Sequence, residues 1–517
     1  MSKDKKQFWK DIKDRKTFKS NHNELNLEGE TDALSVAERF SLHFKSIFDD
    51  DKSFDFDDLN FDNYNNLHKF SYFNCNCISE IFRNLKPYSG IDGVSNYHLK
   101  YASMQFINLF TNFINLCFLH NHVPLKMTSG CIEPLLKEKL LDPTKLTNYR
   151  PIIKSSIFLK VFENLILMRI KDYFKFNDNQ HGFRKQHSTT TACFILKETI
   201  LSYLKFNTPV YAAFLDISKA FDNVNHKVLI QKLLNLNIPL TYLKIIYVWY
   251  RNQNVCVNHD NNLSSVWKLK RGVRQGGILS PLFFNLYIND LLNEVTCSNI
   301  GCKFGIFYQN IIAYADDLVL LAPSISGLQK LINISANACK DLFLEFNTKK
   351  SVCIKFYKYN RLTENINSVV KLGNSPLSFV NNVVYLGFNL SFNLSDNADI
   401  TRVRNKFYAS FNTILRKFYS VDFNIFFILF KTYCKQFYGT QIWLDVNKSN
   451  VMIKQFSVGF HKALKKILGV PNFYSNHLIC EFLDMVTLPH QLHIDKFRFV
   501  FNLFKNPPSF MIKNLNF

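Results

Sequence analysis

Three aspartates lie at the end or in the middle of apolar runs, where a charge is costly. Asp216 closes the run VYAAFLD, and the adjacent pair Asp316–Asp317 lies inside IIAYADDLVLLA. Neighbouring carboxylates in such runs repel each other and lose hydration, so a sequence accepts them where divalent cations neutralise the cluster. Phosphoryl and nucleotidyl transfer use this arrangement, with two Mg²⁺ ions held by carboxylates. Asp is also common in turns between strands, and a tight hairpin would satisfy both interpretations.

A glycine-rich loop and a basic stretch could bind a phosphorylated substrate. The loop RGVRQGGILSP (271–281) contains three glycines, and its Ser280-Pro281 precedes the apolar helical run LFFNLYINDLL. Glycine lets a backbone approach a ligand closely, and a helix start is a good place for an anion. In the stretch EPLLKEKLLDPTKLTNYRPI, Lys137 or Lys139 and Arg150 could hold phosphates. A plain helix-capping loop and solvated surface cations are the alternatives.

Alternating helical and strand-like segments carry these residues and predict an α+β fold. Helical periodicity runs through FLKVFENLILMRIKDYF (158–174). Short β-type runs are expected at 210–217, 311–322, 351–357 and 383–390. After about residue 400 the strand signals fade, and apolar residues recur at helical spacing, as in FHKALKKILGV.

The N-terminal segment is polar. The chain opens with MSKDKKQFWKDIKDRK, which lacks the apolar stretch of a secretory signal. A helical piece is expected at 37–48. The run DDDKSFDFDDLNFDNYNN (49–66) is expected to be a linker, because crowded carboxylates resist compaction.

Charge and cysteine usage indicate the partner and the compartment. The chain has 63 Lys and Arg against 41 Asp and Glu, a net charge of +22, and sixteen Lys or Arg against five Asp or Glu after residue 400. This balance favours a polyanionic partner such as nucleic acid, with an ordinary basic protein as the alternative. The twelve cysteines show no zinc-type spacing, so free thiols in a reducing, intracellular compartment are expected. No apolar run approaches the roughly 18 residues of a membrane span.

Three motifs in order carry a family resemblance. FLDISKAFD (214–222) comes first, RGVRQGGILSP second and YADD (314–317) third. They resemble the F-L-D-x-x-K-A-F-D, G-V-x-Q-G-x-x-L-S-P and Y/F-A-D-D boxes of the reverse transcriptases of non-LTR retrotransposons. The ordered set is far more specific than any one motif.

Further motifs extend the resemblance over about residues 80–400. They are SGIDG (89–93), NYRPI (148–152), QHGFR (180–184) with Ser188-Thr189, FNTKKS (346–351) and YLG (385–387). These resemble the family's G-x-D-G, N-Y-R-P-I, Q-x-G-F-R…S-T, N-x-x-K-T/S and primer-grip Y-L-G motifs. The flanking segments are more weakly similar to jockey- and CR1-type elements.

The resemblance implies a right-hand polymerase, an α+β fold whose antiparallel palm sheet packs on helices. An N-terminal linker or extension would occupy 1–75, fingers and palm 76–395, and a mainly helical thumb with a C-terminal extension 396–517. The implied activity is that of an RNA-directed DNA polymerase, which adds dNTPs to a primer 3′-OH on an RNA template by two-metal nucleotidyl transfer.

The resemblance also implies residue roles. Two Mg²⁺ ions, or Mn²⁺ in their place, would be held by Asp216, Asp316 and Asp317, and Lys350 would protonate the departing pyrophosphate. The residues expected to bind the nucleotide and its triphosphate are Phe221, Gln275, Gly276, Arg150 and Lys137. Those expected to contact nucleic acid are Arg184, Tyr385, Leu386 and Gly387.

The second half of the first motif carries two further expectations. By resemblance, Phe221 is the steric gate that rejects a ribose 2′-OH, and an aromatic residue of the core is the alternative. Asp222 is not expected to bind metal, and charge complementarity with a helix N-terminus would explain it.

The implied partners are an RNA template, a DNA primer or target DNA and dNTPs, with no membrane. The implied location is the nucleus and cytoplasm, as a ribonucleoprotein. Elements of this kind usually carry an N-terminal endonuclease, and with about 75 residues before the motifs we expect that domain to be absent from this chain. A catalytically inactive, truncated copy that at most binds RNA or DNA is the main alternative. An RNA-templated RNA polymerase would share the metal chemistry, but Phe221 argues against it.

Overall fold

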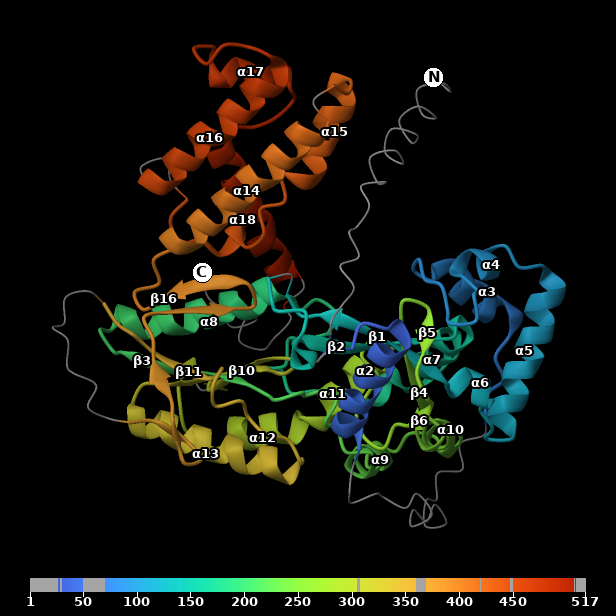
Figure 1. Ribbon diagram of the computed structural model, residues 1–517. Coiled ribbons are helices and arrows are strands. Elements are labelled where there is room, and N and C mark those ends of the chain that lie inside the picture. Colours follow the sequence, from blue (N-terminus) through green and yellow to red (C-terminus); the bar gives the residue numbers. More distant parts are fainter. Residues whose placement is uncertain are drawn as a thin grey trace. The chain divides into compact units, whose positions relative to one another are not determined.

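The computed structural model describes residues 27, 30–49, 70–138, 140–304, 307–358, 369–418, 420–446, 450–505 and 507 (Figure 1). Lys139 and, apart from Asp49, the expected linker at 49–66 lie outside these residues. The chain divides into two compact units. The first unit comprises Met1–Lys175 and Lys219–Tyr287, and the second comprises Phe176–Ser218 and Ile288–Phe517.

The first unit is built on a five-stranded sheet with the order β2-β1-β4-β5, in which β6 also pairs with β4. Strands β1 (Gly130–Leu136) and β2 (Tyr149–Ser155) are antiparallel, and β4 (Asn254–His259) runs parallel to β1. The short strands are β5 (Asn262–Leu263) and β6 (Trp267–Lys268). Helix α2 (Ala33–Phe48) packs on this sheet with a buried aromatic face. The helical piece expected at 37–48 is therefore confirmed.

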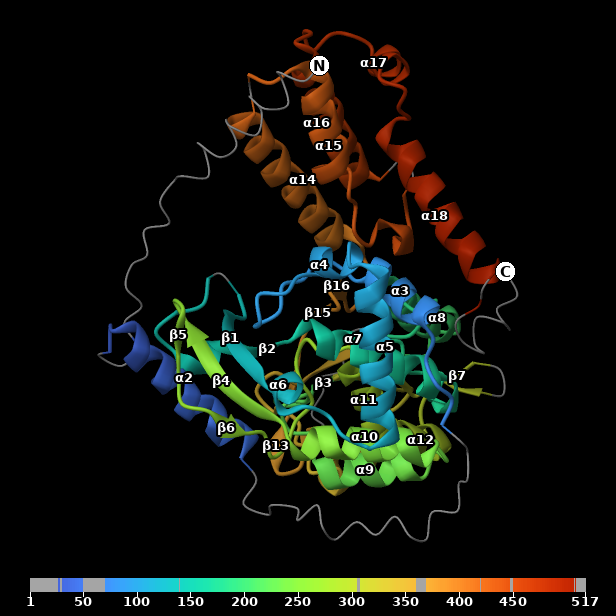
Figure 2. The same ribbon diagram turned by 90° about the vertical axis from the view of Figure 1, so that its right-hand side faces the viewer.

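The other regular elements among the described residues of the first unit are helices. They are α3 (Cys75–Asn84), α4 (Asn96–Lys100), α5 (Met104–Leu119), α6 (Leu125–Thr128), α7 (Ile157–Ile170), α9 (His226–Leu234), α10 (Leu240–Arg251) and α11 (Ser280–Tyr287), with 3₁₀ turns at Leu146–Asn148 and Lys171–Tyr173. Helix α5 lies beside α7 (Figure 2), where the Phe118 and Phe162 rings pack with centroids 4.9 Å apart. The helix expected at 158–174 thus ends at Ile170 and continues as a 3₁₀ turn.

The second unit contains the sheet that carries the three aspartates. Its order is β14-β11-β3-β10-β9, and the central strand β3 (Val210–Asp216) is antiparallel to both neighbours, β10 (Asp317–Ala322) and β11 (Val352–Phe356). The edge strands are β9 (Ile311–Tyr314) and β14 (Ser378–Phe379). Helix α8 (Thr189–Lys205) covers one face, and α12 (Asn289–Cys297) and α13 (Ile325–Asp341) cover the other (Figure 1). Strand β3 is buried up to its last residue, which explains its continuous apolar run.

Three two-stranded ribbons complete the β-structure of the described residues. They are β7 (Lys303–Phe304) with β8 (Phe307–Tyr308), β12 (Lys371–Leu372) with β13 (Ser375–Pro376), and β15 (Asn382–Tyr385) with β16 (Phe388–Ser391). The last ribbon corrects our expectation of a single strand at 383–390. The chain turns back at Leu386 (φ +49°) and Gly387 (φ +81°), and two positive φ angles are what a tight two-residue hairpin turn requires.

The C-terminal part of the second unit is helical, as expected. It contains α14 (Asn397–Lys417), α15 (Phe423–Tyr433), a 3₁₀ turn at Thr440–Ile442, α16 (Val451–Leu468), α17 (Asn476–Phe482) and α18 (Leu488–Lys505). Its core is rich in aromatic rings, with Phe407 packed against Phe430, Phe456 and Phe460. The α+β class, with an antiparallel sheet packed on helices, is confirmed. Among the described helices, none is both long and apolar enough to cross a lipid bilayer.

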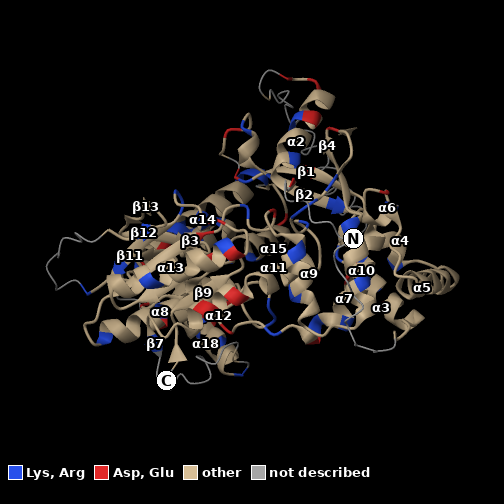
Figure 3. Ribbon diagram, turned by 90° about the horizontal axis from the view of Figure 1, so that it is seen from below, with Lys and Arg blue, Asp and Glu red and all other residues tan. Residues whose placement is uncertain are grey.

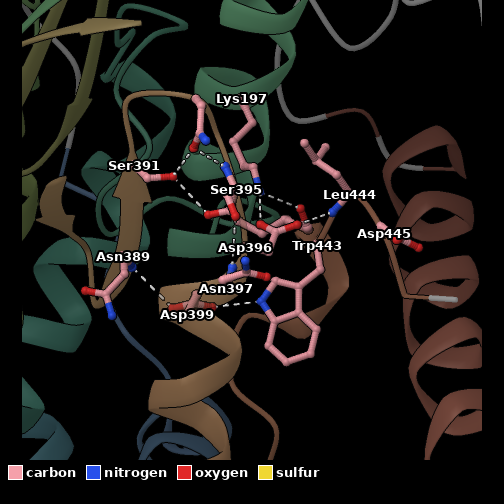
Figure 4. A network of polar contacts seen from close by, with 12 residues as sticks. Lys197, Asn389, Ser391, Ser395, Asp396, Asn397, Asp399, Trp443, Leu444 and Asp445 are labelled. Carbon is pink, nitrogen blue, oxygen red and sulfur yellow. Dashed lines mark hydrogen bonds and ion pairs between the residues drawn. The ribbon is translucent and has the colours of Figure 1, made fainter. Parts of the chain in front are cut away.

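A buried polar junction ties these C-terminal helices to helix α8 (Figure 4). The ammonium group of Lys197 on α8 lies 2.6 Å from Asp396 Oδ1 and donates to the carbonyl of Ile442 over 3.0 Å. The other oxygen of Asp396 accepts from the backbone N–H of Leu444 over 2.6 Å. Side-chain exposure is 4% for Lys197 and 10% for Asp396, so this ion pair is almost withdrawn from water.

A second carboxylate extends the junction. Asp399 accepts from the indole Nε1 of Trp443 over 2.8 Å, from the guanidinium Nε of Arg402 over 2.7 Å and from the backbone N–H of Asn389 over 3.2 Å. Asn389 belongs to β16, so the same acid links a strand to the start of α14 and to the segment after the 3₁₀ turn.

Candidate active site

The first part of the site is the hairpin between β9 and β10. Tyr314 pairs with Asp317 across the hairpin, so Ala315 and Asp316 form its two-residue turn. Ala315 has φ +55°, a left-handed conformation that is unusual for a residue with a side chain. On its other side, β10 pairs with β3 in a register that sets Asp317 opposite Asp216. The fold therefore brings together the acids that the sequence separates by about 100 residues.

The electrostatics of this cluster are those of crowded carboxylates. Burial, followed by the neighbouring charges of Asp316 and Asp216, raises the pKa of Asp317 to about 6, while the charge of Lys350 opposes the rise. Like charges that share a site disfavour full ionisation, and a divalent cation would remove that repulsion. The donor set is oxygen only, which suits Mg²⁺ or Mn²⁺ better than zinc.

The acids supply only part of a coordination shell. Along the described segments, no group of three or more His, Cys, Asp or Glu side chains is arranged to hold a metal ion by itself. Mg²⁺ commonly binds one or two carboxylates and completes its shell with water and substrate phosphates. The carboxylates present thus fit a metal that the substrate helps to hold.

The FNTKKS segment is attached directly to the end of β3. Asn347 donates its backbone N–H to the carbonyl of Asp216 over 2.8 Å, and Ser351 Oγ accepts from the N–H of Asp216 over 3.3 Å. The side chain of Asn347 caps the turn by accepting from the backbone N–H groups of Lys349 and Lys350. The Lys350 ammonium group lies 3.5 Å from Asp216 Oδ2 and is 66% exposed. Lys350 is thus beside the carboxylates, as the sequence predicted for a proton donor, although its role stays a prediction.

The predicted nucleic-acid contacts Tyr385, Leu386 and Gly387 lie on the β15–β16 hairpin. Tyr385 is buried, its ring packs edge-on against Phe214 of β3 with centroids 5.3 Å apart, and burial raises its pKa well above the usual range. Leu386 and Gly387 form the turn, and the carbonyl of Leu386 accepts from Tyr438 Oη over 2.8 Å. At the turn Gly387 is exposed and Leu386 is partly buried, whereas the tyrosine ring is buried.

The predicted nucleic-acid contact Arg184 has extensive internal contacts. Its guanidinium Nη1 donates to the carbonyls of Asn177 and Gln180 over 2.7 and 3.0 Å, and its Nη2 lies 3.9 Å from Asp178. The side chain is 20% exposed, and burial lowers its pKa. Arg184 therefore ties together the loop that carries the QHGFR motif.

The predicted nucleotide-binding residues lie in the first unit. The side-chain N–H of Gln275 donates to Asp222 Oδ1 over 2.8 Å. The backbone carbonyl of Gln275 accepts from the backbone N–H of Ile153 on β2 over 2.9 Å. Gly276 has φ +105°, which glycine tolerates, and its carbonyl accepts from the Lys160 ammonium group. Hydrogen bonds thus attach the glycine-rich loop to β2 and α7.

Asp222 differs from our expectation. Helix α9 begins at His226 with Asn225 as its cap, so Asp222 does not serve that helix N-terminus. It is 4% exposed, and burial raises its pKa to about 6, against the hydrogen bond from Gln275 and the charges of Lys219, Lys137 and Arg271. Asp222 instead orients the amide of Gln275.

The other three predicted residues also lie in this unit. The Phe221 ring is partly buried and stacks on Phe284 of α11, with centroids 4.8 Å apart. Lys137, which directly follows β1, and Arg150, on β2, are both exposed. The Lys137 ammonium group donates to the carbonyl of Thr147 over 2.6 Å. The stack leaves both interpretations of Phe221, gate and core aromatic, as predictions.

One residue that positions the glycine-rich loop was missed by our sequence analysis. Glu163 of α7 is 1% exposed, and its carboxylate accepts from the backbone N–H groups of Ile278 and Leu279. Burial raises its pKa, while Lys160 and Arg274 act against that rise. The signal in the sequence was a single acid within the otherwise apolar helix FLKVFENLILM.

Comparisons with known proteins find relatives over most of the chain. Residues 136–390 match the family described as reverse transcriptase (RNA-dependent DNA polymerase). The chain is 26% identical over 426 residues to the probable RNA-directed DNA polymerase from transposon BS of Drosophila melanogaster, covering 79% of this chain and 46% of that protein. It is 25% identical over 344 residues to the RNA-directed DNA polymerase from mobile element jockey of Drosophila melanogaster, covering 64% and 36%.

A solved structure is also similar. The telomerase from Candida tropicalis, in complex with a TWJ fragment of telomeric RNA, matches with a TM-score of 0.39 and 12% identity, covering 75% of this chain and 68% of that chain. The chain spans less than half the length of the two Drosophila relatives described above.

Proposed function

We propose that this chain acts as an RNA-directed DNA polymerase of the non-LTR retrotransposon type, because its residues 136–390 match the reverse transcriptase family and its relatives include RNA-directed DNA polymerases of mobile elements. It would add dNTPs to the 3′-OH of a DNA primer along an RNA template. The observation that carries this proposal is the register of β3 and β10, which sets Asp216 opposite Asp317 with Asp316 in the adjoining turn. Carboxylates crowded at the end of a buried sheet are costly, and divalent cations would offset that cost.

The acids of the second unit would do the chemistry. Asp216, Asp316 and Asp317 would hold two Mg²⁺ ions, or Mn²⁺ in their place. When bound, the ions would supply activation of the primer hydroxyl and stabilisation of the leaving pyrophosphate. Lys350, beside Asp216, would give a proton to the pyrophosphate oxygen as it departs. Its high exposure leaves the ammonium group able to move towards a substrate.

The residues of the first unit would hold the incoming nucleotide. Gln275, oriented by Asp222, would contact the nucleotide, and Gly276 would leave room for it. The exposed cations Lys137 and Arg150 would meet the triphosphate. Phe221 would exclude a 2′-OH, which favours DNA synthesis over an RNA-templated RNA polymerase.

Nucleic acid is the proposed macromolecular partner. The net charge is +22, and basic residues are spread over elements of both units (Figure 3). Cations along a duplex gain affinity by releasing condensed counterions. The Leu386–Gly387 turn would touch the primer strand, and Arg184 would shape the template side through its loop. We also propose an intracellular ribonucleoprotein, in nucleus and cytoplasm, as the working form.

A primer-extension assay tests the proposal. Purified protein with Mg²⁺ should extend oligo(dT) on poly(rA), and Asp216→Asn should abolish extension while template binding persists, because the carboxylate holds metal and the basic surface holds nucleic acid. Asp341→Asn, an exposed acid at the end of α13, is the matched control and should retain activity. Extension by the Asp216→Asn protein would refute the mechanism. Inactive parent protein that still binds RNA would favour the alternative of a catalytically dead copy.

A further inference from the structure

The QHG segment lies along the edge of the sheet, next to the hairpin of the candidate active site. Gln180 forms a parallel bridge with Ala313 of β9. The backbone N–H of His181 donates to the carbonyl of Ala313 over 2.8 Å, and the N–H of Ala313 donates to the carbonyl of Asn179 over 2.9 Å. The segment is thus a short extra strand on β9, contributed from about 130 residues earlier in the chain.

The side chain of Gln180 reaches from this strand to the turn. It is 0% exposed, and its Oε1 accepts from the N–H of Ala315 over 2.9 Å and from the N–H of Gly182 over 2.8 Å. Two N–H donors fix which end of the amide faces the turn, because the NH₂ end could not accept them. The same residue whose N–H is held, Ala315, has the unusual φ of +55°.

Gly182 meets the turn from the same side. A Cβ added to Gly182 would lie 2.4 Å from the backbone nitrogen of Ala315 and 3.1 Å from the carbonyl carbon of Tyr314. Real Cβ atoms do not approach backbone atoms so closely, so only glycine allows this contact. Gly182 and the side-chain amide of Gln180 therefore both contact the peptide group between Tyr314 and Ala315.

We propose that Gln180 and Gly182 are positioning residues for the catalytic hairpin, which hold Ala315 in its left-handed conformation and thereby fix the two acids that follow it. This inference rests on the proposed function, since it gives these contacts a purpose in metal binding. The alternative is that Gln180 only satisfies backbone groups of the core. The two ideas differ in what the loss of the amide changes: the positioning role predicts weaker metal binding, and the core role predicts lower stability alone.

The chain offers a matched control. Gln309 is also a buried glutamine, 5% exposed, and it bonds to Asn179 Oδ1 over 2.9 Å and to the carbonyl of Ile311 over 3.2 Å. It supports the same edge of the sheet, but its contacts avoid the turn. Gln180→Met and Gln309→Met therefore each remove one buried amide that makes two hydrogen bonds, and only the first should affect the acids.

The test measures metal binding directly, by titrating Mn²⁺ into protein mixed with poly(rA)/oligo(dT) and a non-hydrolysable dTTP analogue, because the acids supply only part of the coordination shell. The free ion is followed by electron paramagnetic resonance. Gln180→Met should weaken binding about fivefold, the equivalent of one hydrogen bond of about 1 kcal/mol, and should speed hydrogen exchange in the hairpin. Gln309→Met should keep the parental affinity. Adding Ala315→Gly to Gln180→Met should restore part of the affinity, because glycine adopts positive φ without strain.

The outcomes separate the two levels of the proposal. Asp216→Asn must lower Mn²⁺ binding, and if it does not, the metal site and the proposed function fail. If Asp216→Asn lowers binding but Gln180→Met keeps the parental affinity and hairpin exchange, the positioning role is wrong and the proposed function stands. Equal losses of Mn²⁺ affinity in Gln180→Met and Gln309→Met would likewise refute the positioning role. Should Gln180→Met not fold, Gly182→Ala decides, since parental Mn²⁺ affinity in that protein would overturn the inference.

Discussion

Replacing Lys197 by methionine should destabilise the C-terminal helices of the second unit by about 3 kcal/mol. Lys197 lies in the buried junction with Asp396, whose carboxylate is 2.6 Å from its ammonium group, and both side chains are at least nine-tenths buried. Removing one partner of such a pair leaves an uncompensated charge and typically costs about 3–5 kcal/mol. The lower end applies here, because Asp396 keeps its bond from the Leu444 N–H and remains within the field of Lys496.

Hydrogen exchange read by mass spectrometry would measure this loss where it occurs. A destabilisation of about 3 kcal/mol should speed exchange in α14 by about 150-fold, because each factor of ten corresponds to about 1.4 kcal/mol. The matched control is Lys205→Met at the exposed C-terminal end of α8, which should leave exchange in α14 unchanged.

A double variant separates the charge from the packing. Lys197→Met with Asp396→Leu removes both charges, and replacing a whole buried ion pair by apolar groups is often neutral or stabilising. The double variant should therefore exchange more slowly than Lys197→Met alone. Exchange within about tenfold of the parent for Lys197→Met, a change of about 1.4 kcal/mol or less, would refute the reasoning that this pair anchors the C-terminal helices.

Two further predictions concern other sites. Phe221→Val should admit ribonucleotides that the parent rejects, measured as incorporation of dTTP and UTP side by side; unchanged selectivity in a folded, active variant would leave Phe221 as a ring that merely stacks on Phe284. Burial and the charge of Arg184 lower the pKa of His187 to about 4 in the folded protein, whereas a histidine in an unfolded chain has a pKa of about 6.5. Between about pH 4 and pH 6.5 the unfolded state therefore binds more protons than the folded state. Stability to urea should therefore fall as pH drops from about 6.5 towards 4, and more gently in His187→Gln; identical pH dependence in the two proteins would contradict this assignment.

The strands of the sheet that carries the three aspartates could be predicted because they are covered on both faces. Strand β3 is buried throughout except at Asp216, so its apolar run was continuous and its one acid was conspicuous. The same holds for β10, where Asp317 is the sole residue that is not fully buried. A charge at the end of an otherwise buried strand is a strong sequence signal, because burial without a purpose would be costly.

Contacts made by neutral side chains across the fold could not be predicted. The bond between Gln275 and Asp222 joins residues 53 positions apart, and that between Gln180 and Ala315 joins residues 135 positions apart. An amide or a glycine in a loop has many local explanations, and only the tertiary structure shows which backbone group it meets. The hairpin turn at Leu386 was also missed, because leucine rarely adopts a positive φ and so does not signal a turn in the sequence.

The two segments that hold the acidic cluster both act through neutral amides. Asn347 caps the turn bonded to Asp216, and Gln180 holds Ala315 beside Asp316. An amide can accept or donate hydrogen bonds without changing the charge of the site. An extra anion in either place would add to the repulsion among the carboxylates, and a cation there would add to the charge that Lys350 already brings within 3.5 Å of Asp216 and would compete with a metal. Neutral supports of this kind would leave the charge of the cluster available to a divalent ion.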